Sequence, residues 1–277
     1  MDARMIFCKI GTPSVYSCSV IALFFLIILC VTTSGPKRVY GISSFSESDK
    51  PFGISYDDWV SKFFNWDFSL NDREFKPQID GCLYNNAGSM VMLMNTVEDS
   101  APLQKCKISS QQGIMIPLWV AWCDNKNDLP KLRNPNALGV ALDQQLTECS
   151  RLYNLGNIKS NVIVDGIPVA KLDITQSLIP GSGNKIYYKI NSMKNVTELY
   201  SKGFNATLAN DTHQSSNIPG PVRAGSQGWW VFLKPFPVGS HSVVYDILVT
   251  PTGAMTSPGT NVHAATIPYT IQVSNPK

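Results

Sequence analysis

Residues 265–273 read Ala-Thr-Ile-Pro-Tyr-Thr-Ile-Gln-Val, and apolar side chains occupy every second position. Successive side chains of a strand point to opposite faces of its sheet, so this alternation predicts a strand with one buried face and one solvated face. The same alternation runs through residues 241–249. The C-terminal part of the chain is therefore expected to be β-structure.

Four further segments are expected to form strands: residues 90–94, 114–122, 185–190 and 229–233. Asp165-Gly166 lies between two apolar arms, which predicts a hairpin turn. Pro117 lacks an N–H group, so its strand is expected at a sheet edge or at a bulge. Strands at this spacing predict a mostly β (α+β) fold, an antiparallel β-sandwich with two or more packed helices. Residues 191–228 are polar and are expected to be mainly loop.

Two segments predict the helices. Ser55 is placed to cap a helix over residues 56–66, in which Trp59 and Phe63 fall on one helical face. A helix docked on the core is the favoured interpretation, and an exposed aromatic platform for carbohydrate is the alternative. Residues 137–153 predict a second helix, whose apolar stripe consists of Leu138, Leu142, Leu146 and Cys149.

The N-terminal segment predicts export. Residues 20–31 are continuously apolar, and no charged residue lies between Lys9 and Lys37. This pattern fits a signal peptide, but residues 15–33 are also nearly long enough for a retained membrane anchor, so both interpretations stay open. The expected organisation is a signal peptide or membrane anchor over 1–34, a linker over 35–54 and an extracytoplasmic domain over 55–277.

Cysteines and sequons agree with export. Three of the seven cysteines lie in the leader, which leaves four in the folded part: Cys82, Cys106, Cys123 and Cys149. An even number predicts two disulfides, with Cys82–Cys106 and Cys123–Cys149 favoured among the three possible connectivities. N-glycosylation sequons begin at Asn195, Asn205 and Asn210.

Charge and motifs point away from several kinds of chemistry. The net charge is +3 without a basic stripe, so nucleic acid is not an expected partner. Ser226 lies in an Ala-Gly-Ser-Gln-Gly segment that lacks the strand–helix context of a nucleophile elbow. Residues 124–128 resemble a calcium loop, but Lys126 takes a ligand position. His241 and His263 are expected to be structural and far apart, and His213 is expected in a loop. No catalytic residue, metal site or cofactor is predicted.

Four motifs carry a resemblance to a known family. They are the Trp-rich opening at 56–66, Cys106 followed by the strand at 114–118, the Asp-Gly turn at 164–169 and the Trp-Trp-Val-Phe-Leu-Lys-Pro-Phe-Pro-Val-Gly-Ser-His hairpin that starts at residue 229. Their order resembles that of a family of uncharacterised exported proteins of archaea and bacteria. The resemblance implies fold and export, and it brings no activity with it.

The function expected from these features is an exported or membrane-anchored cell-surface module that acts in binding or structure. The expected contacts are the membrane, through the N-terminal helix, and a carbohydrate or protein partner. One alternative is an extracytoplasmic enzyme that acts on polysaccharide with Asp57, Asp58 or Asp246. The other is an accessory subunit of a membrane complex.

Overall fold

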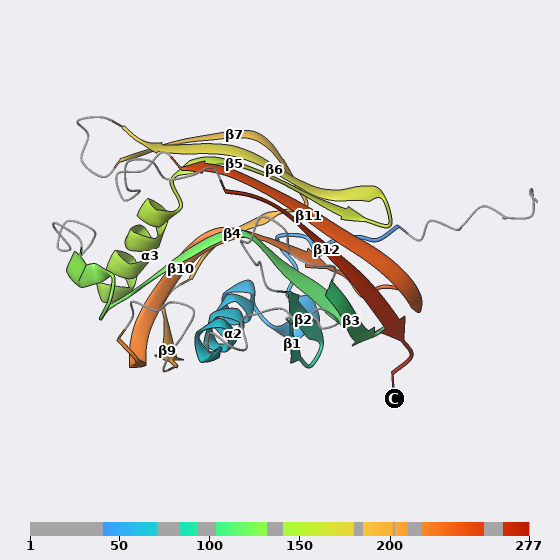
Figure 1. Cartoon of the computed structure of the whole chain (residues 1–277). Coiled ribbons are helices and arrows are strands. Elements are labelled where there is room, and N and C mark those ends of the chain that lie inside the picture. Colours follow the sequence, from blue (N-terminus) through green and yellow to red (C-terminus); the bar gives the residue numbers. More distant parts are fainter. Residues whose placement is uncertain are drawn as a thin grey trace, which may run out of the picture. The chain divides into compact units, whose positions relative to one another are not determined.

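Two six-stranded sheets and two α-helices make up the part of the chain that the structure describes (Figure 1). The computed structural model describes residues 41–70, 84–93, 104–131, 141–179, 185–201, 203–209, 218–251 and 263–276. These elements belong to one unit that starts at Ile42. The predicted mostly β sandwich with packed helices is confirmed.

The strands pair antiparallel in both sheets, with one parallel pair in each. The first sheet has the order β1 (Tyr84–Ala87), β2 (Met90–Leu93), β4 (Gly113–Asp124), β10 (Gly220–Leu233) and β8 (Thr197–Tyr200), and β9 (Phe204–Leu208) also pairs with β10. The second sheet has the order β3 (Gln104–Ser109), β12 (His263–Ser274), β11 (Gly239–Pro251), β5 (Gly156–Val164), β6 (Ile167–Leu178) and β7 (Ile186–Lys194). The parallel pairs are β2 with β4 and β3 with β12.

The main core lies between the two sheets. Tyr245 of β11 and Tyr269 of β12 are fully buried there, and their rings stack with centroids 6.0 Å apart. The apolar faces of both strands, together with buried residues of β3, β5 and β6, supply the rest of this layer from the second sheet. The alternation at 241–249 and 265–273 therefore identified the inward face of each strand correctly.

Helix α2 (Tyr56–Ser69) covers the other face of the first sheet. Ser55 caps it, because its Oγ accepts a hydrogen bond from the Asp58 N–H at 3.2 Å. Trp59 and Phe63 are buried against β10, whose Trp230 points toward the helix while its neighbour Trp229 points into the inter-sheet core. Strand β10 is thus buried on both faces, which explains its unbroken apolar run.

Helix α3 (Leu142–Tyr153) packs against β4 and β10 at one end of the sandwich. Leu146 and Cys149 are buried as predicted, but Leu142 is 43% exposed, so the predicted stripe is wrong at that position. Leu142 begins the helix, and Leu152 lies in the buried face instead. Residues 132–140, which include Leu138, lie outside the described residues.

Local signals for turns were accurate. Asp165 and Gly166 have φ values of 51° and 81° and close the β5–β6 hairpin, which is the left-handed geometry that an Asp-Gly turn supplies. Pro117 lies at a bulge in β4, where Leu118 is left unpaired and the register against Trp229 and Trp230 shifts, in a strand that is central in its sheet. Prolines within sheets are found at such bulges.

The prediction of loop over residues 191–228 is wrong. This stretch contains β8, β9 and the first half of β10. Strands β8 and β9 are short, and β9 buries only Phe204, Ala206 and Leu208 on one face. The N-terminal segment 1–34 lies outside the described residues. None of the helices in the described ranges has the length and hydrophobicity needed to span a bilayer.

Candidate functional site

A cluster of polar side chains joins the two sheets where their end strands approach each other. Tyr188 lies on β7, the last strand of the second sheet, and Glu198 and Tyr200 lie on β8, the last strand of the first. The Tyr188 hydroxyl donates to Glu198 Oε2 at 3.0 Å. The Tyr200 hydroxyl donates to Glu198 Oε1 at 2.6 Å. One carboxylate therefore holds two tyrosines that come from different sheets, and we call these three residues the Tyr–Glu–Tyr cluster.

Two buried side-chain amides, those of Gln227 and Asn154, hold the Glu198 carboxylate in place. Gln227 of β10 is 1% exposed, and its Nε2 donates to Glu198 Oε1 at 3.0 Å. Asn154, at the end of α3 and fully buried, in turn donates its Nδ2 to the side-chain and backbone oxygens of Gln227. Because each donor is itself anchored, the position of Glu198 is set before any ligand arrives.

Strand register explains why these residues meet. In the β8–β10 ladder Glu198 is opposite Trp229, and Tyr200 is opposite Gln227. Cross-strand partners share a face, and Trp229 belongs to the inter-sheet core. On β7, Tyr188 is opposite the buried Gln176 of β6, so its side chain also faces inward.

The electrostatics of the cluster keep both tyrosines protonated. Burial, with the charge of Glu198 second, raises the pKa of Tyr188 to about 12, although the nearby Trp229 side chain opposes the rise. Burial and the hydrogen bond to Glu198 raise the pKa of Tyr200 as well. A phenol used as a nucleophile needs activation toward the phenolate. These hydroxyls instead act as hydrogen-bond donors.

The rings of the cluster remain open to solvent although their hydroxyls are held. Tyr188 is 38% exposed and Tyr200 is 44% exposed. Ile190, two residues further along β7 on the same face, is 48% exposed and extends the apolar surface. The arrangement therefore presents two oriented aromatic rings and an aliphatic side chain around one carboxylate.

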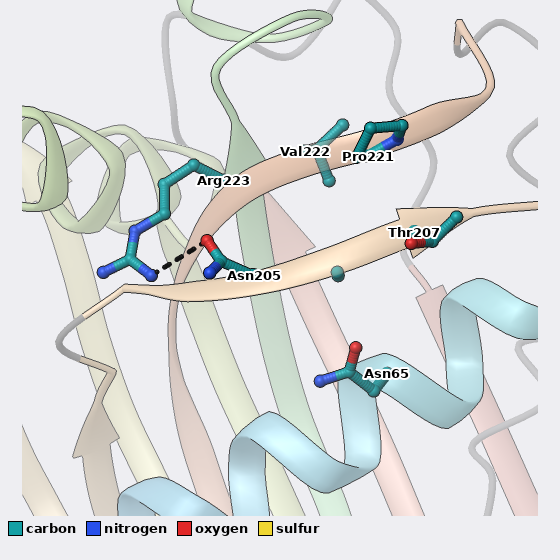
Figure 2. A pocket seen from close by; sticks show the side chains of 7 residues that line it. Asn65, Asn205, Thr207, Pro221, Val222 and Arg223 are labelled. Carbon is teal, nitrogen blue, oxygen red and sulfur yellow. Dashed lines mark hydrogen bonds between the residues drawn. The ribbon is translucent and has the colours of Figure 1, made fainter.

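A separate shallow pocket of about 430 Å³ lies between α2 and β9 (Figure 2). Asn65 of α2 lies beneath β9, and Arg223 of β10 lies at the other end of the pocket. The guanidinium of Arg223 donates to both carboxylate oxygens of Asp143, at 2.6 and 2.8 Å, and to Asn205 Oδ1 at 3.2 Å. The hydrogen bonds from Arg223 hold the pKa of Asp143 below its usual value. Gly203 is needed here, since a Cβ on it would lie 2.5 Å from the Asp143 carboxylate. The charged group of this pocket thus ties α3 to β10.

A larger hollow of about 920 Å³ lies beside the β1–β2 turn and β3. Lys107 is the one charged side chain among the described residues that line it, and Phe52 is the one aromatic side chain. The buried Gln112 accepts from the Ser109 N–H at 2.8 Å and donates to the Gly88 carbonyl at 2.5 Å. These bonds use the amide of Gln112 to close the turn that leads into β4.

The aromatic residues of the opening helix do not form a platform. Trp59, Phe63, Phe64 and Phe68 are each at most 2% exposed and pack on the first sheet. Of the predicted aromatic cluster, Trp66 alone is partly exposed, and it packs edge-on against Phe63. The interpretation as a core helix is confirmed, and the alternative of a carbohydrate platform on this helix is wrong.

The three carboxylates named for an enzyme do not share a cleft. Asp57 and Asp58 lie in the first turn of α2, where Asp58 accepts from the Ser55 hydroxyl at 2.6 Å. Asp246 lies on β11, points away from the inter-sheet core and accepts from Thr266 at 3.1 Å. Both sheets separate it from α2, a spacing of more than about 10 Å, whereas paired glycosidase carboxyls lie about 5–10 Å apart.

Both ring nitrogens of His241 are held by other groups of the protein. Its Nε2 donates to the Pro237 carbonyl at 2.9 Å, and its Nδ1 lies 2.7 Å from Asp165 Oδ2. His263 is at the opposite end of the β11–β12 ladder, as expected, and His213 lies outside the described residues. The segment that starts at Trp229 is not a hairpin, because β10 and β11 belong to different sheets. The contact with Asp165 joins the Asp-Gly turn to the start of β11 at the end of this segment, which gives a physical reason for these two motifs to occur together.

The Ser226 segment and the loop at 124–128 are both structural. Ser226 is 2% exposed within β10, and its N–H donates to Ser201 Oγ at 2.7 Å. Asp124 is fully buried, and its Oδ1 accepts from the N–H groups of Lys126 and Asn127, both at 2.6 Å. Within the described ranges no group of three or more metal-ligating side chains gathers.

The predicted modification sites are only partly within the described residues. Cys123 and Cys149 form a disulfide with a Cα–Cα distance of 5.9 Å. Cys106 is disulfide-bonded too, while its predicted partner Cys82 lies outside the described residues. Asn195 is exposed in the β7–β8 turn and donates to the Val169 carbonyl at 2.7 Å. Asn205 is exposed on β9, and Asn210 lies outside the described residues.

The Tyr–Glu–Tyr cluster was missed at the level of sequence. The strand at 185–190 was predicted, but β8 was assigned to loop, so no pattern placed Glu198 beside Tyr188. Thr197 and Leu199, the two buried residues of β8, alternate with Glu198 and Tyr200. An alternation over four residues is too short to be recognised in a polar segment.

Comparisons with known proteins give no relative: no protein-family model, curated protein or solved structure matches this chain. The resemblance to a family of exported proteins stays a prediction from its four motifs. The function must therefore be argued from the geometry.

Proposed function

We propose that the chain is an exported, membrane-associated cell-surface module that works by binding, with the Tyr–Glu–Tyr cluster as its contact site. The observation that carries the proposal is the combination of held hydroxyls and exposed rings at Tyr188 and Tyr200. Rings that served only packing would gain free energy by burial. Rings held in fixed orientation at the surface are instead suited to contact a partner.

The disulfide supports the export part of the proposal. Cys123 of β4 and Cys149 of α3 are both fully buried, so their bond braces the end of the sandwich from inside. Disulfides persist in oxidising compartments and are rare in the cytosol of mesophiles. The apolar segment at 20–31 supplies the route out of the cytosol.

Surface labelling tests this proposal. The full-length chain, with a tag after its last residue, is expressed and intact cells are treated with a membrane-impermeant amine-reactive biotin. The exposed lysines of β7 are expected to react in intact cells, and the protein is expected in the membrane fraction or the medium.

A variant with polar replacements across residues 20–31 provides the control, and it should remain unlabelled inside the cell. Labelling of the native chain only after lysis would contradict export. Labelling that disappears when residues 15–33 are exchanged for an unrelated anchor, because the chain is then degraded, would instead favour the subunit of a membrane complex.

A further inference from the structure

We infer that the Tyr–Glu–Tyr cluster takes a neutral carbohydrate chain as its ligand, an inference that rests on the surface-module function proposed above. The cluster combines flat apolar surface, free hydrogen-bonding capacity and a carboxylate that repels anions. Each of these three properties is compatible with a neutral sugar.

The flat surface comes from the two rings. A tyrosine carries a large apolar face and a polar tip. The C–H face of a pyranose packs on such a ring, while the sugar hydroxyls lie at its edge. Tyr188 and Tyr200 are suited to this contact because their hydroxyls are fixed on Glu198 and the two residues are 38% and 44% exposed. Little side-chain entropy is lost when a ligand binds to rings that are already ordered.

The hydrogen-bonding capacity comes from the carboxylate. Each carboxylate oxygen offers two lone-pair positions. Oε1 of Glu198 accepts from Tyr200 and Gln227, whereas Oε2 accepts from Tyr188 alone among the described residues. Counted over the described residues, one acceptor position on Oε2 is left beside the rings. The oxygens of the two tyrosine hydroxyls can accept as well, so a sugar hydroxyl has acceptors within reach.

The charge of Glu198 disfavours an anionic ligand. Three neutral donors surround Glu198 and stabilise its negative charge. Arg151 lies near Tyr200, but its guanidinium is already paired with Glu148, with Nη1 2.7 Å from Oε2. An anionic ligand would therefore be repelled by Glu198. A neutral polyhydroxylated ligand avoids this repulsion and can donate to the carboxylate.

The site is open and elongated. Ile190 continues the apolar face of β7 past Tyr188 and is 48% exposed. An open strip suits a polymer that lies across it with more than one ring, whereas a single small molecule would be better enclosed in a cavity.

Binding to defined sugars tests the inference. The full-length chain in detergent is passed over immobilised hexamers of glucose, mannose, galactose and N-acetylglucosamine, and surface plasmon resonance is recorded. Saturable binding to at least one hexamer is expected. Tyr188→Ala and Tyr200→Ala should each weaken that binding about tenfold or more, as truncated aromatic contacts commonly do. Tyr188→Phe keeps the ring and should lose less.

Tyr187→Ala is the matched control, because Tyr187 is 48% exposed on the same strand but points to the other face. It should leave binding unchanged. If an alanine variant is too unstable to assay, the native chain is iodinated with and without the hexamer, and the modified tyrosines are identified by mass spectrometry. A bound hexamer should protect Tyr188 and Tyr200 from iodination and should not protect Tyr187.

Three outcomes would overturn the inference: none of the four hexamers binds, Tyr187→Ala weakens binding as much as Tyr188→Ala, or tetramethylammonium binds at Tyr188 in place of the sugars. In any of these cases successful surface labelling would leave the proposed export intact. Labelling only after lysis would remove the proposed function whatever the sugar result.

Discussion

Asp67 is expected to make the free energy of unfolding fall as the pH rises. It lies on the buried face of α2, is 6% exposed, and burial raises its pKa from 3.8 to about 7. The folded state therefore keeps a proton that the unfolded state loses between pH 4 and pH 7. Because the folded form binds more protons in this interval, the free energy of unfolding falls as pH rises. A difference of about three units corresponds to about 4 kcal/mol, present below pH 4 and lost by pH 7.

Urea unfolding at half-unit steps from pH 4 to pH 8.5, followed by tryptophan fluorescence, measures this loss. Asp67→Asn carries no titrating group, so its stability should lack this slope and should exceed that of the native chain at pH 8 by up to about 4 kcal/mol. Asp246→Asn on the outer face of β11 makes the same chemical change at a partly exposed site and should keep the native slope. A native curve that rises between pH 5 and 7, or an Asp67→Asn curve parallel to it, would refute the reasoning.

Three further predictions concern packing and the disulfide. Replacing Cys123 and Cys149 together with alanine opens a loop of sequence separation 26, which should cost about 3.5 kcal/mol and lower the melting temperature by about 10 °C in a calorimeter; a change below about 2 °C would contradict a bracing role. Gly225→Ala places a Cβ 2.8 Å from Leu146 Cβ, so α3 must move, and denaturant titration should show a loss of about 1–3 kcal/mol; neutrality would mean that α3 is not docked there. Trp59→Ala empties a fully buried site and should lower the free energy of unfolding by about 3–5 kcal/mol in the same titration. An unchanged free energy of unfolding would mean that α2 is not part of the core.

The sequence predicted those parts of the fold in which one strand or helix carries its own signal. The alternation at 265–273 fixed the face of β12, and the Asp-Gly pair fixed the β5–β6 turn. Ser55 and the aromatic spacing after it fixed the start and the buried face of α2. In each case local periodicity and tertiary burial select the same side chains.

Other parts depend on contacts between distant segments. The parallel pairs β2–β4 and β3–β12 follow from how the two sheets close, and nothing in the short segments themselves encodes a parallel partner. Strands β8 and β9 bury few side chains, so they resemble loop.

The candidate site depends on the same kind of contact. Tyr188 and Glu198 are ten residues apart in sequence, but they lie on different sheets and meet where the end strands β7 and β8 approach each other. A sequence pattern shows two tyrosines and a glutamate in a polar stretch. The register against Trp229 and Gln227 places Glu198 and Tyr200 on one face of β8, and the register against Gln176 turns Tyr188 of β7 toward them.

The redox state of Cys123 and Cys149 in living cells tests the central claim of export most directly. Intact cells are treated with acid and an alkylating reagent to trap thiols, and the chain is digested without reduction and analysed by mass spectrometry. An exported domain predicts a cross-linked peptide that contains both cysteines and no alkylated form of either. Recovery of both cysteines as separate alkylated peptides would contradict the account.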